Sequence, residues 1–88
     1  MILPTLKDYP DQMRRLSLKN LSNGSSGLVV EILAQGHTRR RLLDLGLVPG
    51  TKVEAIRRSP AGDPIAYKIR GAIIALRGEV AEQVLISL

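Results

Sequence analysis

The chain has 88 residues, of which 44% are hydrophobic and 24% are charged, and its formal net charge is +5. This length allows one small domain with a thin core, and the absence of cysteine excludes disulfides and thiolate metal sites. No apolar run approaches the ~20 residues that cross a bilayer, and the first residues lack the pattern of a secretory signal, so we expect a cytoplasmic protein without membrane insertion.

The first part of the chain predicts an extension followed by the start of a domain. Residues 1–16 mix prolines and charges, and we assign them to an N-terminal extension before a domain over residues 17–88. A short strand or turn at 17–21 leads into the turn-forming run 22–27. Residues 28–33, LVVEIL, are apolar and β-branched, so they predict the first main strand.

A short helix follows this strand. Thr38 is its predicted N-cap, and the helix is expected over residues 39–45, with its leucines turned inward and its arginines outward. Gly46 fits the position just past a helix end, where a left-handed backbone is needed. Pro49 and Gly50 then have the residue types of a type II turn.

The rest of the chain alternates strands and turns. We predict strands over residues 51–58, 65–70, 72–76 and 84–88, with one possible helical turn at 79–82. The spacing of these segments favours a closed barrel over an open sheet, whose edges would invite pairing with other chains. The predicted fold is therefore mainly β: a small barrel of about five strands with one or two short helices.

The sequence contains no pattern typical of catalysis or metal binding. The only histidine is His37, its nearest carboxylates in sequence are Glu31 and Asp44, and a lone histidine before a helix is most often a loop or capping residue. Asp63 lies in a Gly-Asp-Pro turn, where we expect it to accept hydrogen bonds from backbone amides. We therefore predict a protein without enzymatic activity, bound metal or cofactor.

The positive charge is concentrated in one part of the chain and suggests a binding surface. Residues 38–58 carry six basic residues against two acidic ones. Such a patch attracts an acidic protein face, phosphates or an anionic membrane, although a solvated face that keeps the protein soluble is an equal alternative. Leu47, just past the helix, is a candidate apolar anchor, with the alternative that it plugs the barrel end. The candidate partner-binding residues are Arg39, Arg40, Arg41, Leu47, Arg57 and Arg58.

Nucleic-acid binding is the main rival from another class, and the sequence argues against it. Small barrels that bind single strands stack bases on aromatic side chains along a basic groove. Tyr67 is the only aromatic residue on a predicted strand, and it shares a face with Ile65 and Ile69, so we expect it in the core. We therefore expect no nucleic-acid partner.

Residues 17–88 resemble the ferrous iron transport protein A (FeoA) family. The resemblance rests on the segment RRLLDLGLVPGTKVEAIRRSPAGDPIAYKIRG, followed by IIALRGEVAEQVLI, with the Leu-Gly-Leu run before Pro49-Gly50 as its most recognisable element. It covers about four-fifths of the chain. It implies an SH3-like barrel that acts in bacterial iron homeostasis as an accessory protein, binding and modulating the cytosolic part of FeoB, the membrane GTPase that transports ferrous iron.

The resemblance leaves a second interpretation open. The same barrel is found behind the metal-sensing domains of diphtheria-toxin-repressor-type regulators, so the chain is alternatively a stand-alone interaction module of that kind. A homo-oligomer is compatible with either interpretation.

Overall fold

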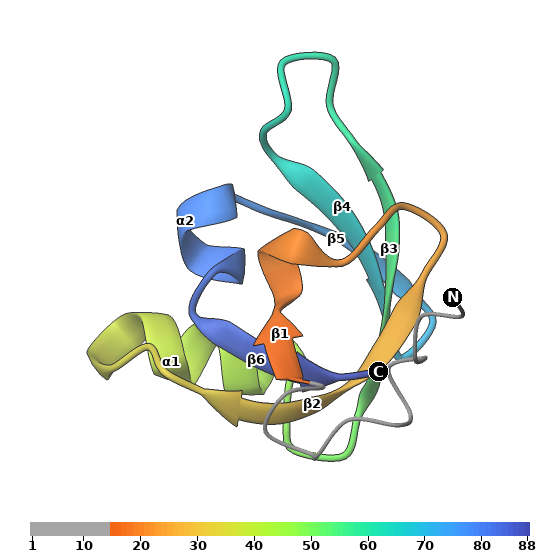
Figure 1. The fold of residues 1–88 in the computed structure, drawn as a ribbon. Helices are drawn as coiled ribbons and strands as arrows, with labels where there is room; N and C mark the ends of the chain where they lie inside the picture. Colours follow the sequence, from red (N-terminus) through yellow and green to blue (C-terminus); the bar gives the residue numbers. More distant parts are fainter. Residues whose placement is uncertain (1–14) are drawn as a thin grey trace, which may run out of the picture.

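The computed structural model describes residues 15–88. In chain order it contains β1 (Arg15–Ser17), the 3-10 helix η3 (Leu18–Asn20), β2 (Ser26–Ile32), α1 (Gly36–Asp44), β3 (Lys52–Arg58), β4 (Ile65–Ile69), β5 (Ala72–Leu76), α2 (Gly78–Ala81) and β6 (Val84–Ser87), as Figure 1 shows.

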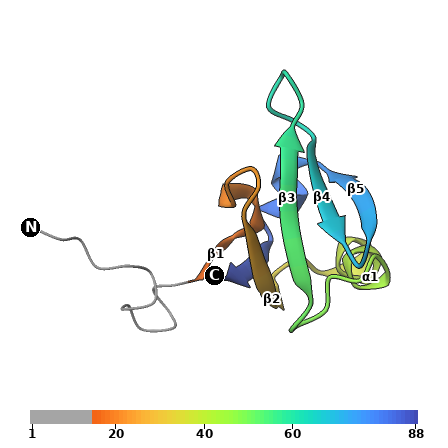
Figure 2. The ribbon, with the colours of Figure 1, turned by 90° about the vertical axis from the view of Figure 1, so that its right-hand side faces the viewer.

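The strands form one strongly curved antiparallel sheet in the order β1-β6-β2-β3-β4-β5. Figure 2 shows β3, β4 and β5 side by side, with α1 seen end-on next to β5. The prediction of a mainly β fold with short helices is confirmed, with six strands in this part of the chain. β1 and β5 are the two edges of the sheet.

The predicted domain boundary at residue 17 falls inside β1. Arg15 and Leu16 pair with Ser87 and Ile86 of β6, so these two residues of the predicted extension belong to the sheet. The remainder of that extension lies outside the described residues.

The curved sheet encloses a single apolar core. β4 contributes Ile65, Tyr67 and Ile69, and all three are buried, which confirms that they share the inner face. The other fully or almost fully buried apolar residues come from every strand except β1, from the three helices and from connecting segments: Leu18, Leu21, Val29, Ile32, Ala34, Leu42, Leu47, Val53, Ala55, Leu76, Ala81, Val84 and Ile86.

α1 begins earlier than the sequence predicts. Gln35, in extended conformation, is the residue before the helix, and Gly36 enters the helix with a positive φ of 62°. Thr38 therefore lies inside the first turn, and its assignment as N-cap is wrong. The physical reason is the glycine, which lets the chain turn into the helix without a side-chain cap.

The end of α1 is predicted correctly. Gly46 has a φ of 101°, and its N–H donates to the carbonyl of Leu43 while the N–H of Leu47 donates to the carbonyl of Leu42, both at 3.0 Å. These two bonds form a Schellman motif, which satisfies carbonyls that the helix end would leave unpaired.

Two tight turns place the strands that follow. Gly50 has a φ of 91°, and the N–H of Thr51 donates to the carbonyl of Val48 at 3.0 Å, which confirms the predicted type II turn. Between β4 and β5, Arg70 and Gly71 both have positive φ, at 51° and 84°. That pair makes a two-residue type I′ turn, which joins the two strands in a tight hairpin.

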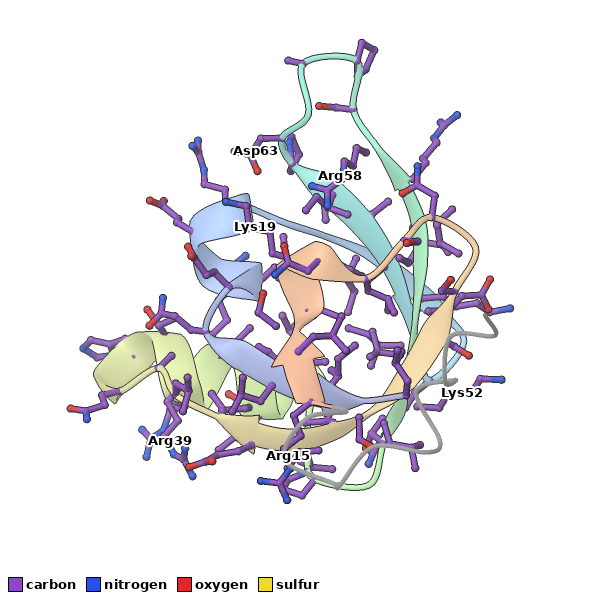
Figure 3. All side chains as sticks on the ribbon, in the orientation of Figure 1. Arg15, Lys19, Arg39, Lys52, Arg58 and Asp63 are labelled. Carbon is purple, nitrogen blue, oxygen red and sulfur yellow. The ribbon has the colours of Figure 1, made fainter. Side chains whose placement is uncertain are left out.

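Side chains tie distant segments of the barrel together through backbone groups. The hydroxyl of Tyr67 donates to the carbonyl of Leu18 at 3.1 Å, and the guanidinium of Arg58 donates to the carbonyl of Lys19. These two bonds join η3 to β3 and β4 at the end of the barrel where Figure 3 shows Lys19, Arg58 and Asp63 near one another.

Asp63 supplies a third such link. Its Oδ1 accepts a hydrogen bond from the N–H of Gly78 at 2.5 Å, which confirms that Asp63 serves a backbone amide, although that amide belongs to α2, 15 residues further along. The carboxylate thus satisfies one of the free N–H groups at the start of α2 and holds the β3–β4 loop against it.

Replacing Asp63 with alanine should lower the free energy of unfolding by about 1–2 kcal/mol, because the N–H of Gly78 loses its acceptor. Asp63→Asn keeps an acceptor oxygen at the same place and should lose less. Urea unfolding of the two variants and the wild type measures the difference. Equal losses in both variants would show that the hydrogen bond to Gly78 is not what stabilises this loop.

Candidate partner-binding site

The three consecutive arginines of α1 do not share one face. Successive helix residues are rotated by about 100°. Arg41 lines a hollow together with Thr38 and Leu42, whereas Arg39 and Arg40 line another hollow with Leu43 and Asp44. Of the three, only Arg41 lines a hollow that adjoins the one lined by Arg57 and Arg58.

Two of the predicted binding arginines are held by backbone carbonyls. Nη1 of Arg39 donates to the carbonyl of Ile32 at 3.0 Å, and Arg58 donates to the carbonyl of Lys19. The bond of Arg39 joins α1 to the end of β2, and the bond of Arg58 joins β3 to η3. Arg39 and Arg58 thus stabilise the fold, while Arg40, Arg41 and Arg57 make no side-chain hydrogen bond to another residue of the described range.

Leu47 is not an exposed anchor. Its exposed fraction is 0%, and it belongs to the apolar core. The Schellman motif explains this position, because the chain turns back under the helix and brings the residue after the glycine against Leu42. Leu47 therefore offers no exposed side chain to a partner, and its burial is compatible with the alternative that it plugs the barrel end.

A hollow of about 340 Å³ lies between the two helices and β5. Arg41 and Arg77 give it positive charge, and the apolar side chains of Leu42, Leu76 and Val80 lie between them. Sequence reasoning missed Arg77, since it stands alone between a strand and a helical turn and joins no run of charge.

A second hollow, of about 480 Å³, adjoins the first. It is lined by Arg57, Arg58 and the β3–β4 loop, and it shares Pro64 and Ala75 with the first hollow. We call the two together the β5 groove. Its lining residues are Thr38, Arg41, Leu42, Arg57, Arg58, Ser59, Pro60, Pro64, Ala66, Ala75, Leu76, Arg77 and Val80. The structure thus brings together Arg41, Arg57 and Arg58 of the predicted set and adds Arg77.

The structure shows no metal centre in the part of the chain that it describes. His37 is exposed at the start of α1, and no three His, Cys, Asp or Glu side chains within residues 15–88 lie close enough together to hold a metal ion. Over the same residues, no helix has the length and apolar character needed to cross a membrane.

A family model described as the FeoA domain matches residues 16–88. Among curated proteins, a Fe(2+) transport protein A/Fe(2+) transporter FeoB fusion protein of Porphyromonas gingivalis is 29% identical over 73 residues, which are 83% of this chain and 9% of the fusion protein. The chain therefore spans less than a tenth of the length of that relative.

Solved structures support the same relationship. The FeoA protein of Chlorobium tepidum is 36% identical with a TM-score of 0.79, covering 83% of this chain and 70% of its own. The zinc complex of Stenotrophomonas maltophilia FeoA, described as a prokaryotic SH3 domain protein, is 28% identical with a TM-score of 0.74, covering 82% and 89%. The predicted SH3-like fold is thus confirmed.

A manganese-dependent transcriptional repressor contains the same fold. It is 21% identical with a TM-score of 0.74, covering 84% of this chain and 42% of the repressor chain. At that identity the likeness extends to the fold alone.

Proposed function

The chain belongs to the FeoA domain family, and on that premise we propose that it is a non-enzymatic accessory protein of ferrous iron uptake, which binds and modulates the cytosolic part of a FeoB-type transporter. The observation that carries this proposal is the Porphyromonas gingivalis protein, whose name joins an FeoA part and a FeoB part in one chain. Linking two modules raises their effective concentration for one another, which favours a direct contact between them.

The absence of convergent reactive groups in the described residues supports a role in binding. General acid/base or nucleophilic catalysis needs titratable side chains that meet one another. Within residues 15–88 every side-chain hydrogen bond runs to a backbone group, and those of Arg39, Arg58, Tyr67 and Asp63 link separate elements. These polar side chains stabilise the barrel, and we propose the β5 groove as the surface that binds the partner.

Base stacking is a poor alternative for this barrel. Tyr67, the only aromatic residue in the described part of the chain, is fully buried, and its hydroxyl is bound to the carbonyl of Leu18. Single-stranded nucleic acids normally stack on exposed aromatic rings. We therefore favour a protein partner in the cytoplasm.

Titrating the purified cytosolic domain of FeoB from the same organism with this protein tests the proposal. We expect saturable binding that weakens as salt is raised, because the exposed arginines of the groove attract an acidic partner and salt screens that attraction. Absence of saturable binding, both to the isolated domain and to membranes that contain the transporter, would contradict the proposal.

Two charge reversals at opposite ends of β3 test where the partner binds. Arg57→Glu should weaken binding about tenfold, since a close charge pair across an interface is worth more than 1.4 kcal/mol. Lys52→Glu changes the net charge equally but lies outside the β5 groove, so it should leave the affinity almost unchanged. Equal losses in both variants would mean that only the overall charge matters. Isothermal titration calorimetry gives both affinities.

A further inference from the structure

β5 leaves two residues with unpaired backbone groups. In a hairpin closed by a two-residue turn, the pair that flanks the turn is hydrogen-bonded, and such pairs then alternate along the strands. The bonded residues of β5 are therefore Ala72, Ile74 and Leu76, whose partners in β4 are given by the register. The N–H and C=O groups of Ile73 and Ala75 point to the other side, where no strand of residues 15–88 pairs with β5.

The residues of this edge strand include no charge, proline or bulge, although α1 stands beside it across the first hollow. Edge strands are normally shielded by charged residues, proline or a bulge, because their free backbone groups can pair with another chain. β5 reads AIIAL, is regular over its five residues, and exposes 61% of Ile73. At the opposite edge, β1 is only three residues long and begins with a charged residue, Arg15.

The first hollow of the β5 groove lies along this same edge. Ala75 and Leu76 are consecutive, and consecutive side chains of a strand point to opposite faces. The hollow borders the strand at these two residues. α1 forms its other wall through Thr38, Arg41 and Leu42.

The charges around the groove are of one sign. Arg41 and Arg77 line the first hollow and Arg57 and Arg58 the second, and no Asp or Glu of residues 15–88 lines either hollow. We propose that the β5 edge binds an extended, acidic segment of the transporter's cytosolic part as an additional strand. The backbone of that segment pairs with Ile73 and Ala75, and its carboxylates meet the groove arginines. This inference rests on the proposed function for the identity of the partner.

A second copy of this chain is a poorer occupant of the same edge. Antiparallel pairing of two β5 strands about Ile74 places Arg77 of each copy opposite Gly71 of the other, beside Arg70. Each end of such a pair would thus bring two positive side chains near each other, and like charges repel. An acidic segment has the opposite effect at these positions.

Amide hydrogen exchange measured by NMR, with and without the FeoB cytosolic domain, tests the backbone pairing. In the complex the amides of Ile73 and Ala75 should exchange at least about tenfold more slowly, because they gain hydrogen-bond acceptors. The amides of Ala72 and Ile74 are already bonded to β4 and serve as internal controls with little change. Binding without slower exchange at Ile73 and Ala75 would overturn the inference and leave the proposed function intact.

Arg41 and Arg40 provide a matched pair of variants for the charge recognition. Both are exposed, both lie on α1, and reversal to glutamate changes the net charge equally. Arg41→Glu should weaken binding about tenfold or more, while Arg40→Glu, outside the groove, should change it less than about twofold. The melting temperatures should match, and equal affinities of the two variants would overturn the assignment of the acidic segment to this groove.

A synthetic peptide separates failure of the inference from failure of the proposed function. The peptide acetyl-Glu-Val-Glu-Val-Glu-amide, at millimolar concentration, should slow exchange at Ile73 and Ala75, whereas its counterpart with lysine in place of glutamate should not. If the FeoB domain does not bind but the acidic peptide protects these amides, the partner is wrong and the binding mode stands. If neither ligand protects them, or if protection grows with protein concentration alone, the inference is overturned.

Discussion

Replacing Leu47 with alanine should lower the free energy of unfolding by about 2–5 kcal/mol, the range observed for large apolar residues truncated in a packed core. Leu47 has no exposed surface and lies in the same core as Leu42, against which the Schellman motif turns it. The loss combines the transfer free energy of the removed carbon atoms with the cavity that they leave. Urea unfolding of the variant and the wild type measures it.

Leu33 provides the matched control for this prediction. It is the same residue type, 50% exposed just after β2, and Leu33→Ala should change the free energy of unfolding by less than about 0.5–1 kcal/mol. If Leu47→Ala were as mild as this control while weakening the binding of the FeoB domain, Leu47 would be a surface anchor after all, and its place in the core would be wrong.

The elements of the fold that sequence predicts well depend on nearby residues. Alternation of Ile65, Tyr67 and Ile69 fixes which face of β4 is buried, because side chains of a strand alternate between its two faces. Gly46 marks the helix end because that backbone position needs a positive φ. Such signals span only a few residues, so a single sequence contains them in full.

The start of α1 shows where such local reasoning fails. Thr38 has the residue type of an N-cap, yet the helix begins at Gly36. Local reasoning is also insufficient for Arg39, Arg40 and Arg41. They form one charged run in the sequence, but in the structure Arg41 lines one hollow and the other two line another. Which of them faces a groove depends on what packs against α1, and the residues of the helix alone do not determine that packing.

The candidate site is mostly a product of tertiary contacts. Arg41 and Arg77 line one hollow although 36 positions separate their numbers in the chain, and Arg58 binds the carbonyl of Lys19 across 39 positions. The free edge of β5 follows from the strand order, since no strand of the described residues 15–88 pairs with β5 on that side. Composition indicates a basic binding surface, but its location requires the fold.

The stability of this protein should fall between about pH 10 and pH 12 because of Tyr67. Burial raises the pKa of its phenol to about 12, despite the opposing effect of the nearby Arg58 charge. In the unfolded chain the phenol ionises near its ordinary pKa of about 10. The stabilising contribution is therefore complete below pH 10 and is lost as the pH rises through 12, since only the unfolded state releases the proton in that window. A difference of two pKa units corresponds to about 2–3 kcal/mol.

Tyr67→Phe isolates this contribution, because lysines and other groups that titrate in the same window contribute equally to both proteins. At pH 7 the variant should be about 1–2 kcal/mol less stable, since the buried carbonyl of Leu18 loses its donor. As the pH rises toward 12 the wild type loses its advantage and the order of stabilities should reverse, which urea unfolding at several pH values would reveal. A stability difference that stays constant from pH 9 to 12 would mean that the phenol ionises as easily in the folded barrel as in the unfolded chain. The burial of Tyr67 and its bond to η3 make that outcome physically inconsistent with this structure.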